Sequence, residues 1–367
     1  MHVVHGGDAR AAARDLHLSL DALIDASANI APEGPPGEVA AVLRALASDP
    51  AAFSRYPDPH YRELQAAAAN HAGVGADRVV VANGSAALIA SALRATNAAR
   101  CILPVPSFSE YRKALATLEM PSLEVPLHPD DGFLPDVPAL VERARTLAPA
   151  CCVLANPNNP TGSALPAERM LDLVDRLQRV GVRTIVDEAF VDYAPSAALP
   201  LDRLPHGTVV LRSITKFHAI PGVRVGYAVS DSATTDAMSR MIPSWSVGAA
   251  DAAIAQAVLT GSSCDERRTS NDRRREVLAS LLRRAGLRVF PSVTNFLFCE
   301  AGARYHGTSG TLRADLLALE HVLVRSCDDY RGLPDGCFVR VAVLDDARNA
   351  RVAEAFTNVM RPQRSGA

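Results

Sequence analysis

Short apolar runs rich in β-branched residues alternate with amphipathic stretches over most of this chain, and this alternation constrains the fold more than any other feature. Helical patterns lie between several of the runs, as in Pro166–Gly181, which ends on a glycine suited to a helix C-terminus. Nearly continuous apolar runs are typical of strands buried on both faces, so the pattern predicts an α/β fold with a mainly parallel sheet covered by helices. The predicted strands are Arg78–Ala82, Arg100–Val105, Cys151–Ala155, Arg183–Ala189, Thr208–Ser213 and Val225–Ser230.

The pattern changes after about residue 245. A long helical region over roughly Asp251–Gly286 leads into β-rich segments at Leu287–Glu300, His321–Cys327 and Cys337–Leu344. These features predict a second, smaller α+β domain, which a chain of 367 residues is long enough to hold. We expect residues 1–45 to form an N-terminal arm and part of the small domain, residues 46–245 the large domain, and residues 246–367 the C-terminal small domain.

Composition excludes several classes of partner. The net charge of −2 gives no overall attraction to nucleic acid or to an anionic membrane. No apolar run reaches the roughly 18 residues that span a bilayer, and the N-terminus lacks the pattern of a secretory signal. The seven cysteines form no CxxC pair and no Cys/His ligand spacing, and several lie in apolar runs. They indicate buried free thiols in a reducing cytoplasm and no metal site.

Polar residues follow several predicted strands at the point where each strand ends. In open parallel sheets, ligands bind at the carboxyl ends of the strands. We therefore expect these polar groups to converge on one edge of the sheet. They include Gly84 and Ser85, Asn159, Asp187, Ser213 and Lys216.

Lys216 is unusual because this chain uses arginine almost everywhere else. Only Lys113 and Lys216 are lysines among the 38 basic residues. A guanidinium stays protonated, whereas a lysine amine can lose its proton and attack a carbonyl. A lysine kept just after a strand therefore suggests a Schiff base, although a surface ammonium would also account for this residue taken alone.

The surroundings of Lys216 in the sequence suggest a phosphorylated cofactor with a ring nitrogen. Asp187 ends the preceding strand, where a carboxylate can pair with a pyridinium nitrogen or can simply cap a turn. Arg224 can hold a phosphate, with the hydroxyls of Ser213 and Thr215 beside Lys216.

The turn at Gly84 and Ser85 leads from a predicted strand into a predicted helix. Free N–H groups and the helix dipole suit a phosphate at such a turn, although most turns of this kind are only helix caps. The sequence contains neither GxxxxGK[ST] nor GxGxxG, which argues against a nucleoside triphosphate or a dinucleotide.

Three motifs, in this order, make the chain resemble the fold type I pyridoxal-phosphate enzymes: "ANPNNPTG" (Ala155–Gly162), "DEAF" (Asp187–Phe190) and "SITKF…PGVRVGY" (Ser213–Tyr227). The branch with histidinol-phosphate aminotransferases and the threonine-phosphate decarboxylases of cobalamin biosynthesis is the most similar. The decarboxylases are nearer, through "HGGD", "SANI", "RYPDPHY", "SWSV", "VRSCDDYRGL" and "VRVAV". The resemblance covers essentially the whole chain and implies a seven-stranded, mainly parallel sheet in a pyridoxal-phosphate-binding large domain.

The resemblance implies a role for each cofactor-site residue. Lys216 would form the Schiff base with pyridoxal phosphate and later move protons. Asp187 would pair with the ring nitrogen and Asn159 with the ring hydroxyl oxygen, while Phe108 would stack on the ring; without the resemblance, Phe108 is equally a core residue. The residues that would cradle the cofactor phosphate are Gly84, Ser85, Ser213, Thr215 and Arg224.

The resemblance also implies a homodimer and a substrate site. Tyr56 would reach the cofactor phosphate of the neighbouring subunit, although it could also be a packing residue before a proline turn. Arg340 matches the arginine that holds the substrate carboxylate; the alternative is a surface arginine of an edge strand. Arg325 matches a second substrate-facing arginine. The N-terminal residues that would meet the substrate phosphate are His5, Gly6, Gly7 and Asn29.

The reaction is less determined than the cofactor. Phe190 stands where the aminotransferases usually have tyrosine, which favours decarboxylation. Leu344 replaces an arginine that is common in the decarboxylases, His218 replaces a tyrosine, and Asp8 replaces a neutral amide; the first and the last weaken the case for a phosphorylated substrate.

Three hypotheses follow. The first is a decarboxylase of an O-phosphorylated amino acid, most closely L-threonine O-3-phosphate. The second is an aminotransferase, or a relative that carries out elimination or decarboxylation-coupled deamination on an unphosphorylated amino acid. The third, a non-catalytic binding module, is disfavoured by the intact set of Lys216, Asp187, Asn159 and Arg224.

Overall fold

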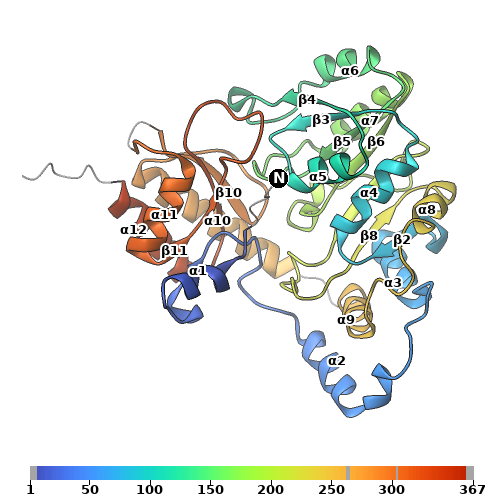
Figure 1. The fold of residues 1–367 in the computed structure, drawn as a ribbon, viewed down its shortest axis with the longest axis horizontal. Helices are drawn as coiled ribbons and strands as arrows, with labels where there is room; N and C mark the ends of the chain where they lie inside the picture. Colours follow the sequence, from blue (N-terminus) through green and yellow to red (C-terminus); the bar gives the residue numbers. More distant parts are fainter. Residues whose placement is uncertain (1–5, 262–264, 303–304, 361–367) are drawn as a thin grey trace, which may run out of the picture.

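A seven-stranded sheet forms the centre of the larger part of the molecule (Figure 1). The computed structural model describes residues 6–261, 265–302 and 305–360. The strand order is β2-β8-β7-β6-β5-β3-β4; β8 is antiparallel to both its neighbours, and the other adjacent pairs are parallel. The predicted α/β class and mainly parallel sheet are confirmed. The strands are β2 (Val79–Ala82), β3 (Cys101–Val105), β4 (Ser122–Pro126), β5 (Ala150–Ala155), β6 (Val182–Asp187), β7 (Val209–Ser213) and β8 (Gly226–Val229).

Helices cover both faces of this sheet, which explains why its central strands are mostly apolar and buried. Alternate residues of β2 enter different cores: Val79 and Val81 pack on one face, Val80 and Ala82 on the other. The helices of the first face are α2 (Gly37–Ser48), α3 (Arg62–Ala72), α6 (Val137–Arg145), α7 (Ala167–Arg179) and α9 (Ala249–Thr260). Those of the second face are α4 (Ser85–Ala95), α5 (Ser109–Thr117) and α8 (Ser232–Ser239). Helix α7 ends, as predicted, just before a glycine with positive φ, Gly181.

The smaller part is α+β, as predicted, and its core lies around a four-stranded antiparallel sheet of order β12-β13-β10-β9. The N-terminal segment joins it, because β1 pairs with β11 in a separate parallel pair. The strands are β1 (Ile24–Asp25), β9 (Arg288–Val289), β10 (Phe296–Glu300), β11 (Val322–Leu323), β12 (Arg325–Ser326) and β13 (Phe338–Ala342). The helices are α1 (Ala9–Asp15), α10 (Asp265–Ala285), α11 (Ser309–Glu320) and α12 (Asp346–Val359).

The helical region expected over roughly Asp251–Gly286 is present and consists of two helices. Helix α9 ends at Thr260 and α10 begins at Asp265. Gly261 has extended backbone, with φ −72° and ψ −178°, so the helix stops there. Helix α9 packs in the core of the large sheet, whereas α10 packs in the core of the smaller part. The domain boundaries expected from the sequence stay a prediction.

In the described part of the chain, no helix has the length and apolarity needed to cross a membrane.

Candidate active site

A cavity of about 530 Å³ opens where the carboxyl edge of the large sheet meets the smaller part. Its wall includes residues that follow β5, β6 and β7, the start of α4, the N-terminal segment and two strands of the small sheet. The convergence expected at this edge is therefore present. The predicted site residues that line the cavity are Gly6, Gly7, Asn29, Ser85, Phe108, Asn159, Asp187, Lys216, Arg325 and Arg340.

Lys216 follows β7 and is half-buried, with its amine 3.2 Å from the Ser213 hydroxyl, to which it donates a hydrogen bond. Burial lowers the pKa of Lys216 to about 8; the positive charges of Arg224 and Arg340 lower it further, and the Asp187 carboxylate opposes them. About a tenth of the amine is therefore neutral at pH 7, and the neutral amine is the state that attacks a carbonyl.

Asp187 is the last residue of β6 and its carboxylate is buried. Its Oδ2 accepts a 2.6 Å hydrogen bond from the Tyr111 hydroxyl, and its Oδ1 accepts one of 2.9 Å from the backbone N–H of Ala189. Burial raises the pKa of Asp187, while these two hydrogen bonds and the charge of Lys216 lower it. The result is an oriented carboxylate in the cavity wall.

A tight turn between β2 and α4 lies beside Lys216 and presents the N-terminus of an eleven-residue helix. Gly84 has φ +78° and ψ 153°, a conformation almost restricted to glycine, and a Cβ there would lie 2.9 Å from Nη2 of Arg224. Gly226 of β8 packs against the same turn so closely that a Cβ would lie 2.7 Å from Ser85 Cα. The absence of both Cβ atoms keeps the backbone N–H of Ser85 and the Arg224 guanidinium close to one another, a geometry suited to a phosphate.

The predicted phosphate residues outside the cavity lining lie near this turn. Ser213 and Thr215 are buried, and their hydroxyl oxygens are 3.1 Å apart. Arg224 is exposed, donates to the carbonyl of Pro221, which lines the cavity, and meets the turn at Gly84. The structure therefore brings Gly84, Ser85, Ser213, Thr215 and Arg224 together around one end of the cavity.

Arg340 lies in the middle of β13, is 6% exposed and lines the cavity. It donates from Nη1 to Asn159 Oδ1 at 2.6 Å and from Nη2 to the carbonyl of Ser27 at 2.9 Å. Its guanidinium lies over the Phe296 ring, and burial lowers its pKa. Among the residues that the structure describes, it donates to no carboxylate.

Arg325, on the neighbouring strand β12, is also buried but differs in its partners. Its Nη2 pairs with Asp329 at 2.8 Å, and it lies 5.0 Å over the ring of Tyr330. The positive charge of Arg325 is thus already compensated, whereas that of Arg340 is available to an anion in the cavity.

The N-terminal segment closes one side of the cavity through short-range contacts. The Ser27 hydroxyl accepts a hydrogen bond from the backbone N–H of Gly7 and donates one to Asp25 at 2.6 Å. A Cβ on Gly6 would lie 3.2 Å from Nη2 of Arg340, so this part of the arm lies directly against that arginine. Asn29 is buried and faces the cavity, and its Oδ1 has no hydrogen-bond partner among the residues that the structure describes. His5 lies outside the described residues.

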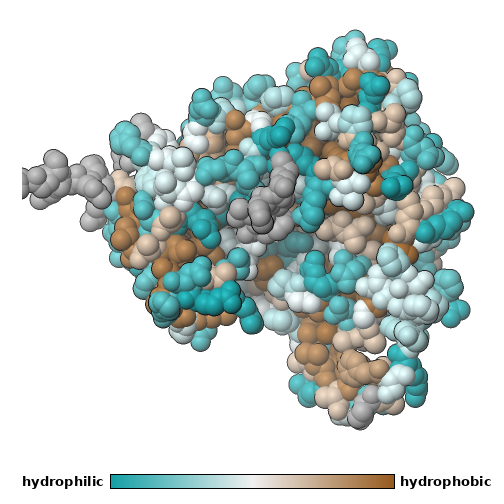
Figure 2. Space-filling view, viewed as in Figure 1, coloured by the Kyte–Doolittle hydropathy of each residue, from teal (hydrophilic) through white to brown (hydrophobic). Residues whose placement is uncertain are grey.

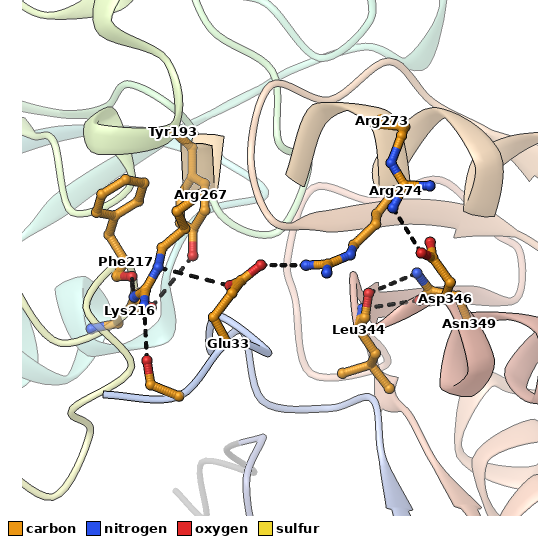
Figure 3. A network of polar contacts seen from close by, with 11 residues as sticks. Glu33, Tyr193, Lys216, Phe217, Arg267, Arg273, Arg274, Leu344, Asp346 and Asn349 are labelled. Atoms are coloured by element: carbon orange, nitrogen blue, oxygen red, sulfur yellow. Dashed lines mark hydrogen bonds and ion pairs between the residues drawn. The ribbon is translucent and has the colours of Figure 1, made fainter. Parts of the chain in front are cut away.

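A network of polar contacts holds the backbone around Lys216 (Figure 3). The Lys216 carbonyl accepts from the backbone N–H of Ala31 at 3.2 Å and from the Tyr193 hydroxyl at 3.4 Å. Arg267 of α10 donates to the carbonyl of Phe217 and, at 2.8 Å, to that of Gly34. Figure 3 shows Glu33 between Arg267 and Arg274, and it forms an ion pair with each. Hydrogen bonds from the smaller part and from the N-terminal segment therefore both hold the loop that carries Lys216 in place.

Tyr56 is the predicted site residue that the structure keeps apart from the others. Its side chain is 81% exposed and contacts Trp245, with ring centroids 4.8 Å apart. The role predicted for it concerns a neighbouring subunit, so within one chain it stays a prediction.

Three of the four departures noted in the sequence, Leu344, Asp8 and His218, lie outside the cavity lining. Leu344 is buried in the core of the smaller part and exchanges backbone hydrogen bonds with the Asn349 side chain. Asp8 is exposed at the start of α1. Phe190 does line the cavity and packs edge-on against Phe296. His218 is buried in contact with Phe217, and burial lowers its pKa to about 4.

Sequence reasoning missed Tyr111, Ser27 and Tyr330, which all line the cavity. Tyr111 lies three residues after Phe108, almost one helical turn further on, and that spacing is the signal that could have found it. Ser27 and Tyr330 carried no comparable signal.

A lysine amine of lowered pKa, a buried carboxylate and a strand-to-helix turn lie at the carboxyl edge of a mainly parallel sheet, the arrangement of a pyridoxal-phosphate enzyme of fold type I. The chain belongs to the class I and II aminotransferase family, which it matches over residues 22–356. It is 37% identical to the threonine-phosphate decarboxylase of Salmonella typhimurium (strain LT2) over 97% of this chain and 96% of that protein. It is 31% identical to a histidinol-phosphate aminotransferase of Chlorobium chlorochromatii (strain CaD3), over 84% and 82% respectively.

Solved structures share the fold. The histidinol-phosphate aminotransferase of Sinorhizobium meliloti in complex with pyridoxal-5′-phosphate superposes with a TM-score of 0.85, covering 98% of this chain and 95% of that one at 23% identity. The cofactor of this chain is pyridoxal 5′-phosphate, and the residues present fit it: the amine of Lys216 with its lowered pKa, the buried carboxylate of Asp187 and Ser85 at the start of α4 line one cavity.

Proposed function

We propose that this protein decarboxylates L-threonine O-3-phosphate to an aminopropanol phosphate with pyridoxal phosphate as cofactor. The observation that carries the proposal is Arg340, a buried guanidinium that faces the cavity without a carboxylate partner among the described residues. A buried cation of this kind calls for an anion in the substrate, which the α-carboxylate of an amino acid supplies. The decarboxylase relative matched over 97% of the chain supports the choice of substrate.

The chain's own residues then have distinct tasks. When bound, pyridoxal phosphate supplies an electron sink for the electron pair left by a bond broken at the substrate Cα. Lys216, with its pKa of about 8, would hold the cofactor through its amine and would move a proton to or from the substrate Cα. Asp187 would pair with the ring nitrogen and Asn159 with the ring hydroxyl. Phe108 would pack against the ring.

The phosphate group has its own set of partners. The N–H groups at the start of α4 and the Arg224 guanidinium would bind it, assisted by the hydroxyls of Ser85, Ser213 and Thr215. Because these groups come from three different segments of the large domain, they would hold the cofactor in place relative to Lys216.

Decarboxylation rather than transamination is supported by Phe190. A phenol at that position would give the ring oxygen a second partner, and the phenyl group that lines the cavity here has no hydroxyl. Asn159 is then the main partner of the ring oxygen. Asp8 and Leu344, which weighed against a phosphorylated substrate in the sequence, are not among the residues that line the cavity.

The polar groups of the N-terminal segment supply the site for the substrate phosphate in this proposal. Asn29 and the backbone of Gly6 and Gly7 face the cavity, with Arg325 nearby on β12. His5 belongs to the same segment by sequence.

The second candidate is an aminotransferase, which the 31% identical histidinol-phosphate aminotransferase supports. The two reactions differ in products: transamination passes the amino group to a 2-oxo acid, whereas decarboxylation keeps it and releases CO2. Elimination or decarboxylation-coupled deamination of an unphosphorylated amino acid is the remaining variant.

We further propose a homodimer with shared active sites. Apolar side chains gather on the projection that α2 and the following residues form (Figure 2). Leu43, Phe53, Tyr56 and Trp245 are 51%, 64%, 81% and 47% exposed. A second copy covering this surface would bring Tyr56 to the cofactor phosphate of its partner. A cytoplasmic location is proposed with it, because the cysteines in the described ranges are free and buried.

The experiment incubates holoenzyme with L-threonine O-3-phosphate, with L-threonine, or with L-histidinol phosphate plus 2-oxoglutarate, and identifies products by mass spectrometry. The proposal predicts aminopropanol phosphate from the first substrate alone, which would place the protein in cobalamin biosynthesis. Glutamate formed from the third mixture, with no amine from the first, would contradict it.

A variant tests the observation that carries the proposal. Arg340→Met is expected to raise KM for the amino acid by at least about 30-fold, the equivalent of about 2 kcal/mol. Arg348→Met is the matched control, since Arg348 is an exposed arginine paired with Asp345 on the same part of the chain. Equal KM values in both variants would remove Arg340 from the substrate site.

A further inference from the structure

The Tyr111 hydroxyl makes the shortest side-chain contact to the carboxylate proposed to face the cofactor ring. Tyr111 lies in the first turn of α5, its ring is 1% exposed, and its hydroxyl donates to Asp187 Oδ2 at 2.6 Å. Phe108 packs edge-on against it with ring centroids 5.7 Å apart. Phe108 is the residue proposed to pack on the cofactor ring. The start of α5 therefore carries both that residue and the tyrosine that donates to Asp187.

The two oxygens of Asp187 have separate donors, so the plane of the carboxylate is fixed. Oδ2 accepts from Tyr111 and Oδ1 from the backbone N–H of Ala189. A carboxylate oxygen has room for a further hydrogen bond, so both remain able to accept one from the cavity side. Without the phenol, Oδ2 would lose its one described donor and the carboxylate could rotate about its Cβ–Cγ bond.

The phenol remains a donor over the working range of pH. Burial and the adjacent Asp187 charge raise the pKa of Tyr111 well above its ordinary value, so its proton stays on the oxygen. The hydrogen bond in turn favours the ionised form of Asp187 against the effect of burial. No proton needs to move between the two groups: the neutral phenol donates and the carboxylate accepts.

We propose that Tyr111 is a positioning residue of the catalytic site, whose hydroxyl holds Asp187 as an oriented carboxylate and through it keeps the cofactor ring nitrogen protonated. The inference rests on the role proposed above for Asp187 and not on the identity of the substrate. Tyr111 touches Asp187 and not the reacting bond, so its effect on the reaction passes through that carboxylate.

The chain contains a matched control for this hydrogen bond. The Tyr305 hydroxyl donates to Asp315 at 2.6 Å, in the smaller part of the molecule and outside the cavity lining. Tyr111→Phe and Tyr305→Phe therefore each remove one hydroxyl and one tyrosine–aspartate hydrogen bond of the same length. Only the first of these bonds involves the proposed cofactor site.

The experiment compares the two variants as holoenzymes. The first readout is the dissociation constant of pyridoxal phosphate, and the second is the pH at which the absorbance of the bound cofactor changes. Hydrogen bonds to charged groups are strong enough that Tyr111→Phe is expected to weaken cofactor binding about tenfold or more and to shift the absorbance transition. Tyr305→Phe is expected to leave both unchanged. Neither readout needs a substrate, so failure of the decarboxylase proposal would leave this test intact.

A double-mutant cycle separates action through Asp187 from simple packing. In an Asp187→Asn background, Tyr111→Phe is expected to weaken cofactor binding by less than about twofold further, because the carboxylate it orients is gone. With L-threonine O-3-phosphate, Tyr111→Phe alone should lower kcat and leave KM within about twofold.

Two results would overturn the inference. One is a Tyr111→Phe holoenzyme whose cofactor affinity and absorbance transition match those of the parent protein. The other is an equal loss of affinity from Tyr111→Phe with and without the Asp187 carboxylate, which would make the phenol a packing group. Melting temperatures show whether each variant is folded. The double-mutant cycle then compares cofactor affinities among the folded variants only.

Discussion

Gly226→Ala should weaken cofactor binding although residue 226 itself donates nothing to the cofactor. Gly226 is the first residue of β8, and a Cβ there would lie 2.7 Å from Ser85 Cα and 2.9 Å from the Gly84 carbonyl carbon. Both are backbone atoms, so no flexible side chain can move aside. Bringing Ser85 Cα from 2.7 Å to an ordinary contact of 3.4 Å requires a shift of at least about 0.7 Å, and the backbone nitrogen of Ser85 lies closer still.

A shift of that size displaces the N–H groups proposed to bind the cofactor phosphate. Hydrogen bonds to charged groups contribute about 1.5–3 kcal/mol each, so loss of one corresponds to roughly 10- to 100-fold in the dissociation constant of pyridoxal phosphate. Overpacking should also lower the free energy of unfolding by about 1–3 kcal/mol. The assay is equilibrium titration of apoenzyme with pyridoxal phosphate, followed by cofactor absorbance, alongside thermal unfolding.

Gly222→Ala is the matched control, because a Cβ at Gly222 meets nothing within 4 Å. It should bind the cofactor like the parent protein. A Gly226→Ala variant that is folded and binds pyridoxal phosphate within about twofold of the Gly222→Ala variant would refute the assignment of this turn to the phosphate.

Three further predictions concern the lysine, its loop and a buried ion pair. Because burial lowers the pKa of Lys216 to about 8, the rate at which apoenzyme captures pyridoxal phosphate should rise with pH and level off above about pH 9 as the amine becomes neutral; a midpoint near pH 10 would contradict this. Arg267→Met should lower kcat about tenfold or more through loss of its contacts to the Lys216 loop, whereas Arg273→Met, which removes an exposed ion pair of the same helix, should not. Glu188→Gln leaves the buried Arg212 without its charged partner at 2.6 Å and should lower the free energy of unfolding by about 3 kcal/mol, measured by urea denaturation of holoenzyme. A loss under about 1 kcal/mol would show that the charge of Glu188 contributes little to stability.

Much of the fold could be predicted because the central strands are buried on both faces. Their sequences are almost continuously apolar, interrupted by Arg183 in β6 and Arg212 in β7, so the sequence pattern predicts β5, β6 and β7. The edge strand β4 was missed, because Ser122–Pro126 is partly exposed and reads as "SLEVP", with no apolar run. The direction of β8 was also hidden: an antiparallel strand within a parallel sheet has the same apolar pattern as its neighbours.

The site could be predicted where it depends on strand ends and not where it depends on packing between elements. Lys216 and Asp187 follow adjacent strands, and a parallel sheet places such residues on one edge. Tyr111 comes from a helix, and its hydrogen bond to Asp187 depends on how α5 packs on the sheet, which the local pattern does not encode. Similarly, the contact between Arg340 and Ser27 joins residues far apart in the chain, and only the packing of the N-terminal segment brings them together.

The most direct test of the proposed reaction is release of labelled CO2 from L-threonine O-3-phosphate that carries carbon-13 in its carboxyl group. Holoenzyme is incubated with this substrate while CO2 and the amine product are measured together, with Lys216→Ala as the inactive control. We predict one labelled CO2 for each aminopropanol phosphate, with no amino group passed to a 2-oxo acid, and no release with the variant. Retention of the label in an oxo acid, or turnover by Lys216→Ala, would contradict decarboxylation at this site.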